Sequence, residues 1–236
     1  MMTSSEQLKR SPVRVFERAT QGGLGAGNIG VVFSRPGGGK TAFLIGLALD
    51  ALLSGRKVLH ISTQEPVERV AAFYDHIFHM MADSVGLEHR LHALLETERN
   101  RHVLVYDRKI FSLEKLEQSV AFLREAAGFT PSFVIMDGTP RFAKTEAWEM
   151  EGVQRLAREW GAEIWTSSHS HREGQSLDAR GVPSEIARFD AYLSLIIRLE
   201  AHRDCIRVRI VKDHLRDEPA DVHLEFDPKT LLLRWP

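Results

Sequence analysis

The 236-residue sequence contains very little cysteine and no large excess of charge of either sign. Cys205 is the single cysteine, which excludes an internal disulfide and leads us to expect a reducing compartment. The 31 basic and 32 acidic side chains give a formal net charge of −1, so no global basic field attracts nucleic acid or a membrane surface. Any contact with nucleic acid would have to come from local basic loops.

Long apolar runs are also missing. No run approaches the roughly 20 residues that cross a bilayer, and the polar residues 1–10 lack the apolar centre of a signal peptide. We therefore expect a cytoplasmic protein without a membrane partner. Hydrophobic residues make up 43% of the chain and charged residues 27%, which is ordinary for a globular protein, and the length fits one domain.

What the sequence does contain is a glycine-rich segment between an expected strand and an expected helix. The apolar residues 31–33 precede it, and the apolar, helix-like residues 42–45 follow it. This order of strand, glycine-rich turn, Lys-Thr and helix is typical of a P-loop, whose backbone N–H groups surround a phosphate chain. The phosphate-binding candidates are Arg35, Pro36, Gly37, Gly38, Gly39, Lys40, Thr41 and Ala42.

Two side chains of this segment carry its chemistry. We expect Lys40 to reach the terminal phosphates of a nucleoside triphosphate and Thr41 to bind Mg²⁺ through its hydroxyl group. Ser34 replaces the first glycine of the usual GxxxxGK[ST] pattern. The alternative is a glycine-rich turn that merely joins a strand to a helix.

From residue 29 onward, expected strands and helices alternate. The strands are 29–33, 57–62, 102–106, 133–136 and 163–167; the helices are 41–53, 67–81, 88–98, one capped by Ser112, and 148–160. Apolar strands that alternate with helices predict an α/β fold, with a mostly parallel sheet flanked by helices. Further strands at 191–199, 205–211, 222–226 and 231–235 have no helices between them and predict a C-terminal antiparallel β extension.

We expect residues 1–27 to form an N-terminal arm that precedes a single domain of residues 28–236. Ser11 and Pro12 are typical of a helix start, and Val13 and Phe16 would share one face of that helix. This small apolar face packs either on its own domain or on a neighbouring subunit, and the sequence leaves both alternatives open.

Two carboxylates lie where expected strands end. Asp137 follows the apolar residues 133–136, which is the setting of a carboxylate that holds Mg²⁺ beside a P-loop, although many such residues merely close a strand. Glu65 follows the strand 57–62. Because the carboxyl ends of parallel strands meet at one edge of a sheet, Glu65 is a candidate for the base that activates water. The alternative is a Glu that starts the next helix.

Polar segments follow two later strands. His169 comes just after the strand 163–167, where it would sense a terminal phosphate. His169 and His171 are spaced like metal ligands, but no nearby cysteine or carboxylate cluster supports a zinc site. Lys212 and Arg216 either extend toward the nucleotide of an adjacent subunit as positive fingers or belong to a solvated turn.

Together these segments resemble the RecA-type ATPases, most closely the ATPase domain of DnaB-type replicative helicases, followed by KaiC-type ATPases. Residues 34–43 are similar to the helicase signature Ala-Arg-Pro-x-x-Gly-Lys-Thr-Ala-Phe, in which Arg-Pro is the specific part. Residues 62–65 resemble Ser-Leu-Glu with one residue added, and residues 168–172 resemble Ser-Gln-Leu-Asn-Arg. Residues 212–214 resemble Lys-Asn-Arg.

The resemblance implies a RecA-like fold from about residue 24 to the carboxyl terminus, with Mg²⁺-dependent ATP hydrolysis at the interfaces of a homo-oligomer, commonly a hexamer. It implies that Glu65 is the catalytic glutamate and that His169 occupies the position of a phosphate-sensing glutamine. It also implies that Lys212 belongs to the intersubunit finger, in which His214 replaces an arginine.

Three functions stay open. The first is a motor on single-stranded nucleic acid, with cations in loops that would face the channel of a ring: Arg141, Lys144, Arg172 and Arg180. The second is a KaiC-like regulatory ATPase that acts on protein partners; the near-neutral charge and the absence of the helicases' separate amino-terminal domain favour it. The third, a nucleotide-binding module with little turnover, is suggested by the two histidine replacements.

Overall fold

The computed structural model describes residues 12–20, 22–170, 176–214, 216, 219, 221 and 223–234, and nine strands in these residues form one sheet. The strands are β1 (Ile29–Ser34), β2 (Val58–Ser62), β3 (Arg101–Val105), β4 (Phe133–Asp137), β5 (Glu163–His169), β6 (Leu193–His202), β7 (Cys205–Asp213), β8 (Leu224–Phe226) and β9 (Leu233–Arg234). They lie in the order β3-β2-β4-β5-β1-β6-β7-β8-β9. The strands from β3 to β6 are parallel, and β7, β8 and β9 continue the sheet with antiparallel pairing.

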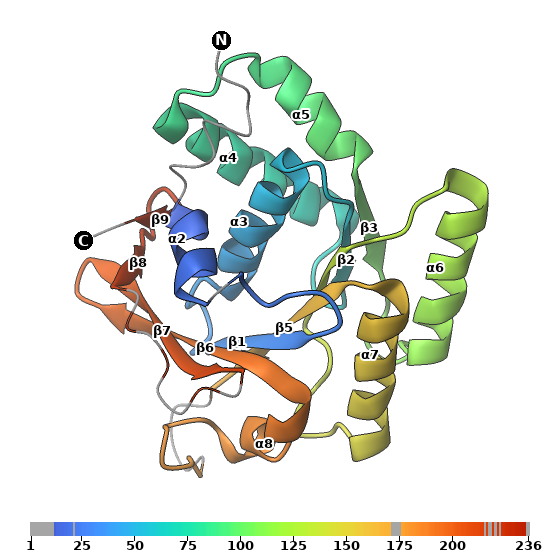
Figure 1. Cartoon of the computed structure of the whole chain (residues 1–236), viewed down its shortest axis with the longest axis vertical. Coiled ribbons are helices and arrows are strands. Elements are labelled where there is room, and N and C mark those ends of the chain that lie inside the picture. The colour runs from blue at the N-terminus through green and yellow to red at the C-terminus, as the bar shows by residue number, and fades with distance from the viewer. Residues whose placement is uncertain are drawn as a thin grey trace.

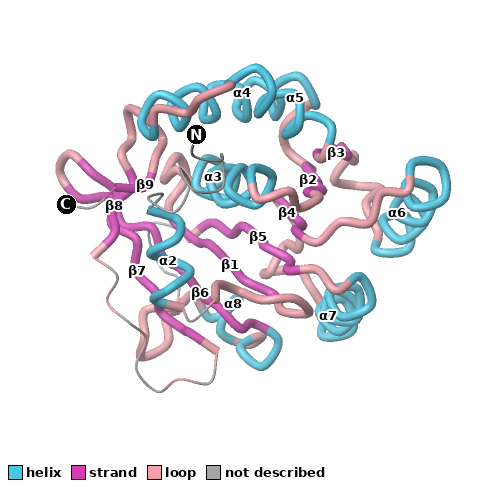
Figure 2. Tube along the Cα trace, turned by 45° about the horizontal axis from the view of Figure 1, so that its top comes forward, coloured by secondary structure: helices cyan, strands magenta, loops and turns pink. Residues whose placement is uncertain are grey.

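Helices cover both faces of this sheet (Figures 1 and 2). One face carries α2 (Pro12–Ala19), α3 (Lys40–Leu53), α4 (Val67–Val85) and α5 (Arg90–Arg99); the other carries α6 (Leu113–Ala127), α7 (Ala147–Trp160) and the short α8 (Ser184–Ala187). The chain crosses the sheet in one direction from β1 to β3 and returns from β3 to β5. Because crossovers between parallel strands are right-handed, reversing the direction moves the helices to the opposite face.

The parallel strands lie between two apolar cores, one on each face. β1, β2 and β4 are buried along their whole length, which explains why their sequences are mostly apolar and do not alternate between apolar and polar residues. Side chains still alternate between the faces: along β4, Ile135 belongs to the core under α3, whereas Met136 belongs to the core under α6 and α7.

The described part of the N-terminal segment packs on its own chain. Val13 and Phe16 of α2 are buried. The ring centroid of Phe16 lies 6.4 Å from that of Phe43 and 6.2 Å from that of Trp165. Of the two alternatives for this apolar face, the structure therefore shows the first: the face packs on its own domain. Ser11 and the residues before it lie outside the described part.

The predicted fold class is confirmed: the protein is α/β, with a mostly parallel sheet, flanking helices and antiparallel C-terminal strands. β5 continues to His169, beyond its predicted end, because Ser168 and His169 still pair with β1. The helix α8 and the 3₁₀ turn Asp190–Tyr192 were not predicted, because both are too short to show a helical period. No helix in the described ranges is long and apolar enough to cross a membrane.

Candidate functional site

The glycine-rich segment forms the turn between β1 and α3 at the carboxyl edge of the parallel strands. Gly37 and Gly39 have φ angles of 73° and 80°, in the left-handed region that favours glycine. A Cβ atom on Gly39 would lie 2.9 Å from the ring of Phe226 in β8. The antiparallel extension therefore supports the turn from the side and leaves room there only for glycine.

Lys40 lies at the start of α3, and its ammonium group contacts two neutral side chains. Lys40 Nζ is 3.3 Å from Ser34 Oγ and 3.0 Å from His169 Nδ1. Because an ammonium group only donates, His169 Nδ1 is the acceptor, which assigns the ring hydrogen to Nε2. Burial lowers the pKa of Lys40 to about 8, although the carboxylate of Asp137 acts in the opposite direction. A buried cation of this kind is suited to accept an anionic ligand.

Asp137 receives two hydroxyl hydrogen bonds. Thr41 Oγ1 donates to Asp137 Oδ2 over 2.7 Å, and Ser167 Oγ donates to Asp137 Oδ1 over 2.6 Å. Asp137 ends β4 and points toward α3, as the alternation along the strand requires. The side chains of Lys40, Thr41, Asp137 and His169 thus meet at the carboxyl ends of three neighbouring strands.

The donor set around Thr41 and Asp137 fits a small, hard cation. Within the described ranges, no group of three or more His, Cys, Asp or Glu side chains could hold a metal ion. Mg²⁺ does not require such a group, since it usually binds one or two protein oxygens together with phosphate oxygens and water. One carboxylate and one hydroxyl group beside the glycine-rich turn match this requirement. His171, the second histidine of the predicted spacing, lies outside the described residues.

Glu65 lies on the loop after β2, close in register to Asp137. Ser62 pairs with Asp137 across the sheet, and Ser62 Oγ accepts the backbone N–H of Glu65 at 2.9 Å. The Glu65 carboxylate forms an ion pair with Arg69 at 3.1 Å, and its side chain is 38% exposed. The structure therefore places Glu65 on the correct edge of the sheet, but the carboxylate contacts the first turn of α4. Both sequence alternatives for Glu65 remain compatible with this position.

Lys212 belongs to a different ionic cluster. Lys212 Nζ donates to the Asp190 carbonyl at 2.6 Å and to Asp190 Oδ2 at 2.8 Å, and Arg180 binds Asp190 Oδ1 at 2.7 Å. Burial opposes ionisation of Asp190, but the hydrogen bonds from Lys212 and Arg180 hold the pKa of this carboxyl below its ordinary value. The structure does not bring Lys212 to Lys40 within one chain.

The neighbours of Lys212 bind the N-terminal segment. His214 Nδ1 lies 2.9 Å from Asp213 Oδ1, and His214 Nε2 lies 3.1 Å from the Leu24 carbonyl oxygen. Arg216 contacts Asp213 Oδ2 at 2.7 Å and donates to the Ala19 carbonyl at 3.0 Å. In the single chain, the predicted finger segment therefore fixes the end of β7 to the last residue of α2 and to Leu24.

No protein-family model matches this chain, and no curated protein matches it in sequence. The interpretation of the site therefore rests on its geometry. Two functional contacts were missed by sequence reasoning: the hydroxyl group of Ser167 on Asp137 and the ring of Phe226 against Gly39. A hydroxyl near the end of the strand before His169 was a usable signal for Ser167, whereas Phe226 follows Gly39 by too many residues for any local pattern.

Proposed function

We propose that the protein is a RecA-like P-loop ATPase that binds ATP with Mg²⁺ and hydrolyses it in the cytoplasm. The observation that carries this proposal is the contact of 2.7 Å between Thr41 Oγ1 and Asp137 Oδ2, beside the buried ammonium group of Lys40. A metal-binding hydroxyl, a metal-binding carboxylate and a phosphate-binding lysine then lie together at one turn. A turn that only joined a strand to a helix would have no need for this combination.

The backbone of residues 35–39 and the start of α3 would bind the phosphate chain of ATP. Lys40 would exchange its contacts with Ser34 and His169 for the terminal phosphates, since a charged acceptor gives a stronger hydrogen bond than a neutral one. His169 would then be released when the phosphate arrives, which gives it the sensing role expected at this position.

Thr41 and Asp137 would hold Mg²⁺, which neutralises phosphate charge and orients the terminal phosphate group. Ser167 keeps the other oxygen of Asp137 occupied, so that Oδ2 is the atom directed at Thr41. Glu65 would act as the base for water only after its carboxylate leaves Arg69. A ligand that orders the loop after β2 would supply that movement.

The experiment that tests this proposal is ATP hydrolysis by Glu65→Gln with Glu68→Gln as the matched control, since Glu68 is an exposed carboxylate in the first turn of α4. We expect Glu65→Gln to lower turnover about 100-fold or more while ATP affinity stays the same. Glu68→Gln should hydrolyse ATP as the wild type does. Equal turnover in all three proteins would remove Glu65 from the mechanism, and absence of ATP binding in the wild type would refute the proposal itself.

The target of the ATPase separates two versions of the proposal: a motor on single-stranded nucleic acid and a KaiC-like regulatory ATPase on protein partners. One observation favours the regulatory version. Arg180, one of the cations expected to face nucleic acid, forms ion pairs with Asp178 and Asp190. Failure of single-stranded DNA to bind or to stimulate hydrolysis at low salt would exclude the motor, since phosphate contacts are strongest there. Sedimentation with and without ATP would test the proposed homo-oligomer, expected to be a hexamer.

A further inference from the structure

A pocket lies at the carboxyl end of β4, on the face of the sheet opposite Lys40. Its volume is about 160 Å³, and its apolar lining includes Met136, Leu113 and Val153. These three side chains belong to the core under α6 and α7 or pack against it. Asp137, the next residue of β4, points the other way, toward Thr41. The two sites therefore share the end of one strand but lie on opposite faces.

The pocket gathers three cations from two loops. Arg108 comes from the loop after β3, and Arg141 and Lys144 come from the loop after β4. All three residues are exposed, and in the described part of the chain their side chains form neither an ion pair nor a hydrogen bond. The lining contains a single carboxylate, that of Glu149. It accepts the backbone N–H of Glu146 at 2.8 Å and so caps α7.

This arrangement differs from that of several other arginines on the surface. Arg155 forms ion pairs with Glu159 and Glu117, and Arg180 does so with Asp178 and Asp190. Like charges that converge repel one another, and the local excess of three cations over one carboxylate favours an anion.

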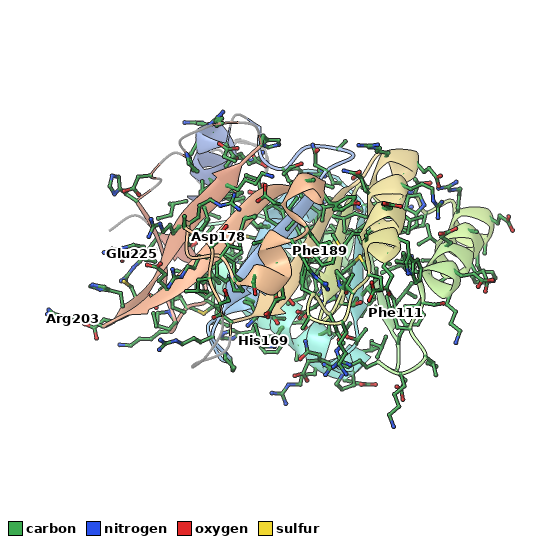
Figure 3. The ribbon with its side chains drawn as sticks, turned by 90° about the horizontal axis from the view of Figure 1, so that it is seen from below. Phe111, His169, Asp178, Phe189, Arg203 and Glu225 are labelled. Carbon is green, nitrogen blue, oxygen red and sulfur yellow. The ribbon has the colours of Figure 1, made fainter. Side chains whose placement is uncertain are left out.

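We propose that this pocket binds a phosphoryl group that belongs to a ligand other than the nucleotide of the glycine-rich turn. Two guanidinium groups and one ammonium group match the charge of a phosphate, and guanidinium groups are frequent phosphate ligands. Further polar partners are the hydroxyl groups in the lining, from Thr63, Ser112, Thr139 and Thr145. The ring of Phe111 also lines the pocket, on the side of α6 (Figure 3). A phosphorylated small molecule and the phosphodiester backbone of a single strand share this chemistry.

A short chain of hydrogen bonds connects the pocket with Asp137. Gly138 lines the pocket, and its backbone N–H donates at 3.2 Å to Ser167 Oγ, which donates at 2.6 Å to Asp137. Thr63 also lines the pocket, and its N–H donates at 3.2 Å to the Asp137 carbonyl. A ligand that moves Gly138 or Thr63 would therefore alter the metal-binding carboxylate. This coupling rests on the proposed function, whereas binding in the pocket does not.

The test uses the full chain with Lys40→Met, which removes the phosphate-binding lysine of the glycine-rich turn. Pyrophosphate and a thymidylate oligonucleotide are titrated separately by calorimetry at low salt. We expect at least one probe to bind, and Arg108→Gln with Arg141→Gln to weaken that binding about tenfold or more. Arg99→Gln with Arg124→Gln is the matched control, because these exposed arginines lie outside the pocket. It should bind as its parent does.

The outcomes separate the two sources of the phosphate. Binding of pyrophosphate that depends on Arg108 and Arg141 supports a small phosphorylated ligand. Binding of the oligonucleotide alone, with the same dependence, supports a single strand. If neither probe binds, or if the two substitutions leave the binding unchanged, the proposal that this pocket binds a phosphoryl group is wrong. Failure of the proposed function is seen independently, as absence of ATP binding by the wild-type chain.

Discussion

Lys40 and Lys212 were both expected to act on the nucleotide, but the structure gives them opposite surroundings. Lys40 is buried among neutral partners, and its pKa is lowered to about 8 by burial. Lys212 is bound to the carboxylate of Asp190, which itself holds Arg180. A cation whose burial is compensated by no carboxylate contact gains much from an anionic ligand, whereas one that already has an ion pair gains little. The surroundings of Lys40 therefore agree with the phosphate-binding role proposed for it, whereas those of Lys212 indicate a structural role within the single chain.

The largest expected effect comes from the removal of the Lys40 ammonium group. Lys40→Met keeps an apolar side chain of similar length and removes the charge. We expect its affinity for Mg²⁺–ATP, measured by calorimetry, to fall about 100-fold or more, because a charge-assisted contact with the terminal phosphates is lost. Without nucleotide, the Tm of this variant should rise by about 3 °C, because the cost of burying an ammonium group is removed.

The two measurements separate binding from folding. A variant that lost affinity because it unfolded would show a lower Tm, so a higher Tm with lost affinity identifies Lys40 as a ligand-binding group. Affinity equal to that of the wild type would refute phosphate binding at the glycine-rich turn.

A second prediction concerns the carboxylate that faces Thr41. Asp137→Asn keeps the size of the side chain but replaces a charged oxygen by an amide. We expect ATP to bind equally well in the presence of a chelator, while the gain in affinity from Mg²⁺ falls at least about tenfold. Isothermal titration with and without Mg²⁺ measures both quantities. The control is Asp107→Asn, because Asp107 is an exposed aspartate at the same edge of the sheet. If the Mg²⁺ dependence of Asp137→Asn equals that of the wild type, Asp137 does not bind the metal.

A smaller effect follows from pH. Since the pKa of Lys40 is about 8, its charge in the free protein is lost above that pH, and ATP affinity should fall by up to about tenfold per pH unit. Stability without nucleotide should change in the opposite direction. Between pH 8 and the ordinary lysine value of 10.5, the unfolded chain binds more protons than the folded one, so the free energy of unfolding rises with pH. Lys40→Met should lack both trends.

Most of the fold could be predicted from the sequence, because its signals are local. Continuous apolar runs gave the parallel strands, and helical spacing gave the helices on either side. The order of strands in the sheet could not be predicted, since it depends on contacts between distant segments. α8 was missed for a different reason: four residues are too few to show a period.

The contacts of the candidate site likewise fall into those that the sequence could predict and those that it could not. Thr41 and Asp137 could be placed together because a strand end and a glycine-rich turn must share one edge of a parallel sheet. The contact between Lys40 and His169 and the pairing of Glu65 with Arg69 depend on side-chain rotamers, which no sequence pattern specifies. Lys212 shows the limit most clearly, because its partner Asp190 lies 22 residues earlier in the chain.

The smallest expected effect tests the Lys212 side of the comparison. Lys212→Gln and Asp190→Asn should each lower the free energy of unfolding by about 1–2 kcal/mol, because either change breaks a partly buried ion pair. Denaturant unfolding of both single variants and the double variant should give an effect smaller than the sum, since they remove one shared interaction. ATP affinity of the single chain should be unchanged in all three. If Lys212→Gln alone lowers turnover while Asp190→Asn does not, then Lys212 acts on a nucleotide held by a neighbouring copy. Lys40 and Lys212 would then both act on nucleotide phosphates.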